Sequence, residues 1–151
     1  MKSEPQTAMV NPQARLAGFL CENGAHFFYD VSNPSRRNLP PSFTGYAVAS
    51  LNQVQLPQIA KALLSGAQGV LLAGCNVCHA RHGAELERRF TQMIRTLADF
   101  GVDEQRLRLE WITAHEEERF LNVIREMTGR LQRLPALRLP SELGKHVRYC
   151  G

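Results

Sequence analysis

No stretch of the sequence approaches the roughly 20 consecutive apolar residues that a membrane-spanning helix requires. The first residues, MKSEPQTAMVNPQAR, also lack the apolar segment of a secretory signal peptide. We therefore expect a cytoplasmic protein without a membrane span. Cysteine is scarce as well, with four residues in 151. In a reducing compartment such cysteines bind metals or carry redox chemistry more often than they form a disulfide framework.

Charge of one sign is not concentrated anywhere along the chain. The 18 Lys and Arg residues outnumber the 14 Asp and Glu residues, but they are dispersed and mixed with Glu. A nucleic-acid site usually has a clustered basic stripe with interleaved aromatic residues, so we expect no nucleic-acid partner. Aromatic residues make up only 7% of the chain. The single tryptophan, Trp111, falls in a predicted strand, and we expect it in the core.

The sequence contains enough apolar residues, 44% of 151, to form the core of one domain. Short apolar runs alternate with segments of helical periodicity, which favours a parallel sheet. The predicted strands span residues 14–21, 45–50, 70–74 and 107–112, and the predicted helices span residues 53–64, 85–100 and 116–134. We predict a small three-layer α/β domain of flavodoxin-like style, with a parallel sheet of about four strands and flanking helices.

The ends of the chain differ in composition from this central region. Residues 1–14 contain two prolines among polar residues and are predicted to form a flexible N-terminal arm. Residues 15–134 form the predicted α/β domain. Residues 135–151 contain Pro135 and Pro140 and show no clear period, so we expect an extended C-terminal tail. Within the domain, residues 22–43 are predicted to be a loop with at most one short helix near residues 26–30.

Three of the four cysteines follow predicted strands. Cys21 ends the first strand, and Cys75 and Cys78 come directly after the third, while Ser50 ends the second. Because the carboxyl ends of parallel strands meet at the edge where ligands bind, these side chains are predicted to converge on a metal or redox site. The sequence also shows no nucleotide loop, catalytic triad or second metal motif. A small domain without these features is expected to have little function alone.

The cysteine pattern leaves several chemistries open. Thiolates bind iron–sulfur clusters, zinc and copper, and the two-residue spacer lets Cys75 and Cys78 face one centre from a tight turn. The pair could also be buried cysteines without a metal, or a thioredoxin-like dithiol. The string CNVCH matches the haem c attachment pattern with His79 as axial ligand, but that attachment requires export. His79 and His82 could ligate a metal, shuttle protons, or be exposed residues of the turn.

The long runs around these cysteines resemble a known family. The segments GAQGVLLAGCNVCHARHGAELERRF, LADFGVDEQRLRLEWITAHEEERF and FLCENG are similar to the delta subunit of methyl-viologen-reducing hydrogenase. That iron–sulfur subunit links a [NiFe] hydrogenase to heterodisulfide reductase. The resemblance covers about residues 15–134, except for the loop 25–44.

The resemblance implies an electron-transfer subunit that carries a [2Fe-2S] cluster and has no substrate of its own. Its expected partners are a heterodisulfide-reductase-A-like flavoprotein, which holds the FAD, and a hydrogenase, formate dehydrogenase or related redox subunit. Cys21, Cys75 and Cys78 match family cysteines and are the metal ligands that the resemblance implies. The alternative functions are a structural adaptor of such a complex that has lost its cluster, and a freestanding dithiol oxidoreductase.

The sequence departs from the family pattern at two ligand positions. Gly24 and Ser50 stand where the family has cysteines, and the spacer between Cys75 and Cys78 is shorter than the usual one. Three thiols do not complete a four-cysteine site. A cluster would therefore take its fourth ligand from Ser50, His79 or Cys150, or it has been lost.

Overall fold

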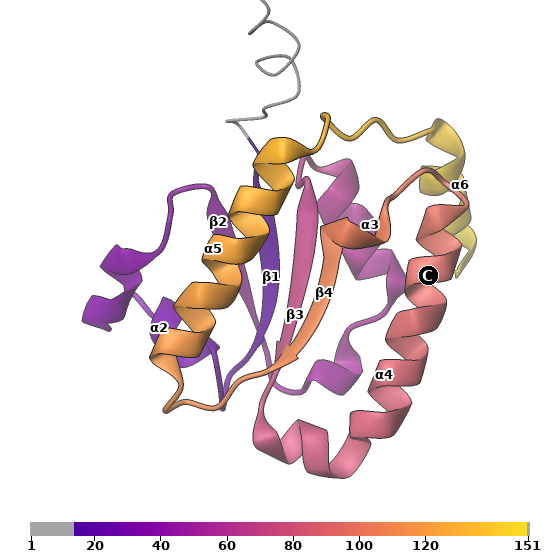
Figure 1. Ribbon diagram of the computed structural model, residues 1–151. Helices are drawn as coiled ribbons and strands as arrows, with labels where there is room; N and C mark the ends of the chain where they lie inside the picture. The colour runs from indigo at the N-terminus through magenta and orange to yellow at the C-terminus, as the bar shows by residue number, and fades with distance from the viewer. Residues whose placement is uncertain (1–13, 151) are drawn as a thin grey trace, which may run out of the picture.

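The computed structural model describes residues 14–150, with side chains up to His146, and shows an α/β fold built on one sheet. The strands are β1 (Leu16–Cys21), β2 (Phe43–Val48), β3 (Gly69–Gly74) and β4 (Leu107–Trp111). All neighbouring strands are parallel, in the order β2-β1-β3-β4 (Figure 1). This order follows the flavodoxin-like winding, and the predicted α/β class is confirmed.

The burial of the two central strands explains why their positions could be predicted from the sequence. Every residue of LAGFLC in β1 and of GVLLAG in β3 is buried. A parallel strand with both faces covered has this near-continuous apolar composition. The edge strands β2 and β4 are only partly buried. Their pattern is weaker, and β2 begins two residues before the predicted strand.

Helices cover both faces of the sheet (Figure 1). Apolar side chains of α3 (Leu56–Leu64), α4 (Asn76–Ala98) and α6 (Ser141–Cys150) join one core cluster. Side chains of α2 (His26–Tyr29) and α5 (Glu117–Arg133) join the other. Successive side chains of a strand point to opposite faces, so β1 sends Cys21 into the first cluster and Leu20 into the second. The result is the predicted three-layer domain.

Short 3-10 turns occupy several connections. They are η1 (Pro34–Asn38), η2 (Leu51–Gln53) and η3 (Glu104–Arg106). The predicted helix 53–64 therefore divides into η2 and α3, because Val54 and Gln55 are extended and Pro57 lies in the first turn of α3. The loop 22–43 contains one short α-helix, α2, as predicted, and also η1.

Two predictions about elements are wrong. Helix α4 begins at Asn76, nine residues before the predicted start, because Cys75 supplies the N-cap and no proline interrupts the segment. The C-terminal tail is not extended over residues 141–150, which form α6. Leu143 of this helix is fully buried in the cluster with α3 and α4, so packing against the domain stabilises a segment too short to be helical alone. The predicted N-terminal arm lies almost entirely outside the described residues.

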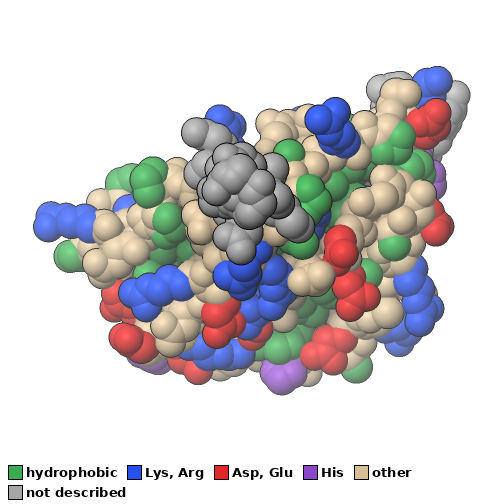
Figure 2. Space-filling model, turned by 45° about the horizontal axis from the view of Figure 1, so that its top comes forward, with side chains coloured by type: hydrophobic (Ala, Val, Ile, Leu, Met, Phe, Trp, Pro, Cys, Tyr) green, Lys and Arg blue, Asp and Glu red, His purple; other side chains and the backbone are tan. Residues whose placement is uncertain are grey.

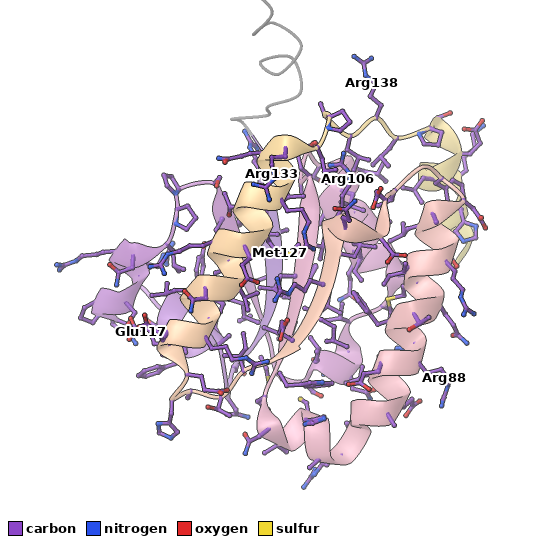
Figure 3. The ribbon with its side chains drawn as sticks, viewed as in Figure 1. Arg88, Arg106, Glu117, Met127, Arg133 and Arg138 are labelled. Carbon is purple, nitrogen blue, oxygen red and sulfur yellow. The ribbon has the colours of Figure 1, made fainter. Side chains whose placement is uncertain are left out.

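The amino end of the sheet is held by a buried arginine. Arg106 is 4% exposed, and its guanidinium donates hydrogen bonds to the carbonyl oxygens of Gln68 and Pro135. Figure 3 shows Arg106 at this end and Met127 on α5.

On the face drawn in Figure 2, the Lys and Arg side chains lie among Asp and Glu side chains. Among the described residues, no helix has both the length and the apolarity that a membrane crossing needs.

Candidate metal centre

The sheet places two cysteines at its topological switch point. The chain leaves β1 for β2 on one side, and β3 then pairs with the other side of β1. Cys21 is the last residue of β1, and Cys75 directly follows β3. In open parallel sheets the crevice at the carboxyl ends of these two strands is where ligands bind. The convergence predicted from the strand ends therefore occurs at the position that the fold favours for a site.

The start of α4 brings the third cysteine to the same place. Cys75 is the N-cap of α4, and its Sγ accepts a hydrogen bond from the backbone N–H of Cys78 at 3.5 Å. A cap and the residue three positions later lie over the same end of a helix. The N-terminus of a helix carries partial positive charge, which favours thiolates there. The Cys-x-x-Cys pair thus lies on the first helical turn and not on the tight turn that the spacing suggested.

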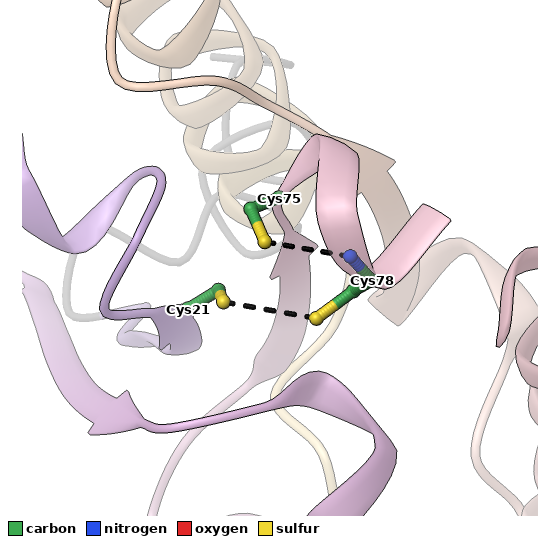
Figure 4. A group of neighbouring side chains, drawn as sticks. All are labelled: Cys21, Cys75 and Cys78. Carbon is green, nitrogen blue, oxygen red and sulfur yellow. Dashed lines mark hydrogen bonds between the residues drawn. The ribbon is translucent and has the colours of Figure 1, made fainter. Parts of the chain in front are cut away.

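The sulfur atoms of Cys21, Cys75 and Cys78 form a compact group, which we call the three-thiol centre. All three sulfurs lie within 4.8 Å of one another, and the Sγ atoms of Cys21 and Cys78 are 3.8 Å apart (Figure 4). The three residues are free cysteines and are 0%, 1% and 5% exposed. Buried thiols so close together are a suitable donor set for a soft metal ion.

Ser50 lies beside the three-thiol centre. It caps η2, accepting a hydrogen bond from the backbone N–H of Asn52 at 3.3 Å. Its Oγ is also 3.6 Å from the Sγ of Cys78. The structure therefore brings together four of the side chains predicted from the sequence: Cys21, Ser50, Cys75 and Cys78.

The environments of two thiols differ. Burial raises the pKa of the Cys21 thiol to about 12, and the neighbouring thiols of Cys75 and Cys78 add to the increase, whereas the backbone N–H of Asn23 opposes it. Burial also acts to raise the pKa of Cys78. Hydrogen bonds from the backbone N–H of Leu51, the Ser50 hydroxyl and the other two thiols outweigh that effect and hold the pKa below its ordinary value. Cys78 is thus surrounded by donors that stabilise a thiolate.

The other predicted site residues lie elsewhere or outside the description. The exposed His79 ring stacks on the ring of Trp111, with centroids 4.7 Å apart. Among the described residues, the ligand atoms that converge are the sulfurs of the three-thiol centre, and His79 is not among them. His82 is half-buried along α4 and is also not in that group. Cys150 ends α6, but its side chain lies outside the described residues.

The position of Trp111 in a strand predicted a core residue, but the structure shows it only partly buried, packed against the core. Its ring is half-buried at the edge strand β4, where Nε1 donates to the Glu87 carboxylate at 3.1 Å. Gly74 pairs with Trp111 in the strand register, and a Cβ at Gly74 would lie 2.5 Å from the indole ring. The indole therefore packs over the end of β3, one residue before Cys75. A glycine opposite a tryptophan is visible in the sequence only after the strand register is known.

Arg89 is a supporting residue that the sequence pattern did not reveal. The guanidinium Nη2 donates to the backbone carbonyls of Asn52 at 2.8 Å and of Val54 at 3.4 Å, and Nη1 contacts the Asn52 side chain at 3.4 Å. Arg89 thereby ties η2, which follows Ser50, to α4, which carries Cys78.

Gly24 closes the three-thiol centre from the β1–α2 connection. A Cβ on Gly24 would lie 2.5 Å from the carbonyl oxygen of Ile112 and 3.1 Å from the Cβ of Cys75. Gly24 also forms an isolated antiparallel bridge with Thr113. The backbone at residue 24 thus lies directly against Cys75, at a separation that a side chain would prevent.

The fold and the site define the class of this protein, a flavodoxin-like α/β domain with a group of cysteines at its switch point. Residues 16–135, which are most of the chain, match the family model described as methyl-viologen-reducing hydrogenase, delta subunit. The chain belongs to this family, and the resemblance noted in the sequence is confirmed.

Curated relatives fall into two groups. An F420-non-reducing hydrogenase iron–sulfur subunit of Archaeoglobus profundus is 32% identical over 108 residues, covering 70% of this chain and 79% of the relative. The vhc iron–sulfur subunit of an F420-non-reducing hydrogenase of Methanococcus voltae is 27% identical over 138 residues, covering 89% of this chain and 96% of the relative.

The second group consists of longer proteins. A subunit of the ferredoxin/F420H2-dependent CoB-CoM heterodisulfide reductase of Methanosarcina acetivorans is 32% identical over 122 residues, which are 79% of this chain. The matched segment is only 15% of that relative's length. A segment similar to this chain therefore forms a minor part of the reductase subunit.

Proposed function

We propose that this chain is an electron-transfer subunit of an oxidoreductase complex and that the three-thiol centre binds its redox-active iron. The carrying observation is the convergence of three buried sulfurs, all within 4.8 Å of one another, at the switch point of the sheet. Thiolates are preferred ligands of iron in electron-transfer proteins. The family and the printed names of the hydrogenase iron–sulfur subunits support this function.

The proposed partners are a heterodisulfide-reductase-A-like flavoprotein, which would hold the FAD, and a hydrogenase, formate dehydrogenase or related redox subunit. In the Methanosarcina relatives, a segment similar to this chain belongs to the heterodisulfide reductase polypeptide itself. A domain that is covalently joined to a partner in one protein is a good candidate to bind a similar partner when it is a separate chain. We propose that the complex is cytoplasmic.

The [2Fe-2S] cluster implied by the family makes a demand on the spacing of the three sulfurs. Such a cluster has two irons with two protein ligands each, so three thiolates must divide two and one. In two of the three sulfur pairs, the two sulfurs would then be bound to different irons. Such sulfurs lie farther apart than two sulfurs on one tetrahedral metal, whose separation is about 3.8 Å for metal–sulfur bonds of about 2.3 Å. The sulfurs all lie within 4.8 Å of one another, which favours a single metal ion over a two-iron cluster.

The second candidate function is a structural adaptor that docks in the same complex without a redox metal. Gly24 and Ser50 favour it, because neither residue supplies a thiolate to the three-thiol centre. The dithiol oxidoreductase has less support. Exchange requires an accessible thiolate, and none of the three thiols is more than 5% exposed.

The test is purification of the tagged chain from its native source under anaerobic, gentle conditions. We expect a flavin-containing partner in the complex, iron bound to this chain, and bleaching of the visible absorbance of that iron when the flavin partner is reduced. Recovery of the complex with no iron in this chain would favour the adaptor. Recovery of a free monomer without iron would overturn both functions.

A further inference from the structure

We infer that the three-thiol centre and Ser50 together hold a single metal ion in a tetrahedral site of three sulfurs and one oxygen. This inference rests on the proposed function only in taking the ion to be iron. It differs from the family expectation in the number of metal atoms and in the fourth donor.

The distances between donors match a tetrahedron around one ion. Four ligands at about 2.3 Å for sulfur and about 2.1 Å for oxygen place two sulfurs about 3.8 Å apart and a sulfur and an oxygen about 3.6 Å apart. The Sγ atoms of Cys21 and Cys78 are 3.8 Å apart, and the Oγ of Ser50 is 3.6 Å from the Sγ of Cys78. Cys75 lies within 4.8 Å of both other sulfurs and supplies the third sulfur of the proposed site.

The surroundings of the sulfurs restrict the size of the centre. Gly24 lies directly on Cys75, where an added Cβ would be 3.1 Å from the Cys75 Cβ. On another side, the Sγ of Cys21 is 3.8 Å from the carbonyl oxygen of Ala49, to which it donates. Two connections and the first turn of α4 thus enclose three nearly inaccessible thiols. This enclosure favours one ion over a cluster of two irons and two bridging sulfides.

The charge of such a site is moderate. Three thiolates and one divalent ion carry a net charge of minus one when Ser50 remains a neutral hydroxyl, and binding releases the three thiol protons. The N-terminus of α4, with the backbone N–H of Cys78 donating to Cys75, faces this negative charge. The backbone N–H of Leu51 supports the Cys78 sulfur in the same way.

The direct test is anaerobic titration of the reduced, metal-free full chain with Co²⁺, whose absorption reports both coordination geometry and thiolate ligation. We expect saturation at one Co²⁺ per chain, with tetrahedral ligand-field bands and sulfur-to-metal charge transfer. In protein purified from the native source we expect one iron per chain and no acid-labile sulfide.

Four results decide the matter. One iron without sulfide supports both the single-ion site and the electron-transfer function. One zinc and no iron supports the single-ion site but overturns the electron-transfer function. Two irons with two sulfides per chain overturn the single-ion site and leave the proposed function standing. A chain that binds neither Co²⁺ nor iron overturns both.

Variants identify the fourth donor. Ser50→Ala should weaken Co²⁺ binding by about 10- to 100-fold, whereas Ser50→Cys should strengthen binding and shift the charge-transfer bands to lower energy. Ser65→Ala, at the exposed C-cap of α3, is the matched serine control and should bind like the parent chain. Cys150→Ala tests the remaining cysteine and should also leave the titration unchanged. Unaltered affinity in Ser50→Ala, or lost affinity in Cys150→Ala, would overturn the assignment of Ser50.

Discussion

At the scale of single residues, Gly24 shows how a small side chain shapes the three-thiol centre. Its backbone approaches both the carbonyl of Ile112 and the side chain of Cys75. A side chain at this position would need the β1–α2 connection to move away from the backbone after β4. Gly24 therefore contributes to the compactness of the centre.

Gly24→Ala is expected to lower the free energy of unfolding by about 1–3 kcal/mol, the usual cost of forcing an atom into a filled site. The reason is the 2.5 Å approach of the added Cβ to a backbone oxygen, which no side-chain rotation relieves. Urea denaturation of the purified variant measures the effect.

The control for this prediction is Gly129→Ala. Gly129 lies inside α5, and the nearest atom to an added Cβ is 3.6 Å away on the flexible Arg133 side chain. Alanine is favoured over glycine in a helix interior by about 0.5–1 kcal/mol, so this variant should be at least as stable as the parent chain. Equal stability of the two variants would show that Gly24 is not closely packed.

At the scale of elements, the centre depends on how η2 is attached to α4. Ser50 and Leu51 stand at the start of η2, and Arg89 from the third turn beyond Cys78 holds this turn by hydrogen bonds to Asn52 and Val54. One long side chain thus links the segment with the oxygen donor to the helix with two of the thiols.

Arg89→Ala should cost about 1–3 kcal/mol of stability, since hydrogen bonds to a charged group are lost and carbonyls of η2 are left without that donor. It should also speed hydrogen exchange of the Leu51 and Asn52 amides. Arg88→Ala is the matched control, because Arg88 is exposed and points outward from α4 (Figure 3). Exchange at these amides that is no faster than in Arg88→Ala would contradict the proposed attachment.

Helix α6 provides a second prediction at this scale. Leu143 is 0% exposed and belongs to the core cluster that α3 and α4 share. Leu143→Ala should lower the free energy of unfolding by about 2–5 kcal/mol, because it removes a buried side chain and leaves a cavity. Leu64, the last residue of α3, is 45% exposed, so Leu64→Ala should lower the free energy of unfolding clearly less. Similar losses for both variants would mean that α6 does not pack on the domain.

At the scale of the whole molecule, the proposed ion would connect segments that are far apart in the sequence. Cys21 ends β1, Ser50 precedes η2, and Cys75 and Cys78 begin α4. A metal that binds only when these segments are assembled stabilises the native state over the unfolded chain. The fold and the site are therefore thermodynamically coupled.

Co²⁺ in 100-fold excess over its dissociation constant should raise the free energy of unfolding by about 2.7 kcal/mol. Thermal or urea denaturation of the full chain, with and without Co²⁺ under anaerobic conditions, measures this gain. Cys75→Ser should keep the far-UV circular dichroism of the parent but lose the gain. A gain that persists in Cys75→Ser would show that Co²⁺ binds elsewhere.

The sequence alone determined the class of the fold and the place of the site. Continuous apolar runs identify β1 and β3 because both faces of these strands are covered, and the cysteines follow directly. From that pattern the meeting of Cys21, Cys75 and Cys78 at one sheet edge could be predicted. Strands that alternate with helices favour a parallel sheet, and the carboxyl ends of parallel strands lie at the same edge. The tail containing α6 was missed, because its helix forms through contacts with α3 and α4 that no local pattern contains.

The tertiary structure decided the spacing of the three sulfurs and the position of Ser50 beside them, on which the proposed one-ion site rests. Separations between sulfurs, the approach of Ser50 to Cys78 and the packing of Gly24 on Cys75 depend on strand register, on the start of α4 and on the attachment of η2 by Arg89. These distances arise between segments separated by tens of residues. The spacing on which the proposed one-ion site rests is therefore set by packing across the fold, and residue type and order do not reveal it.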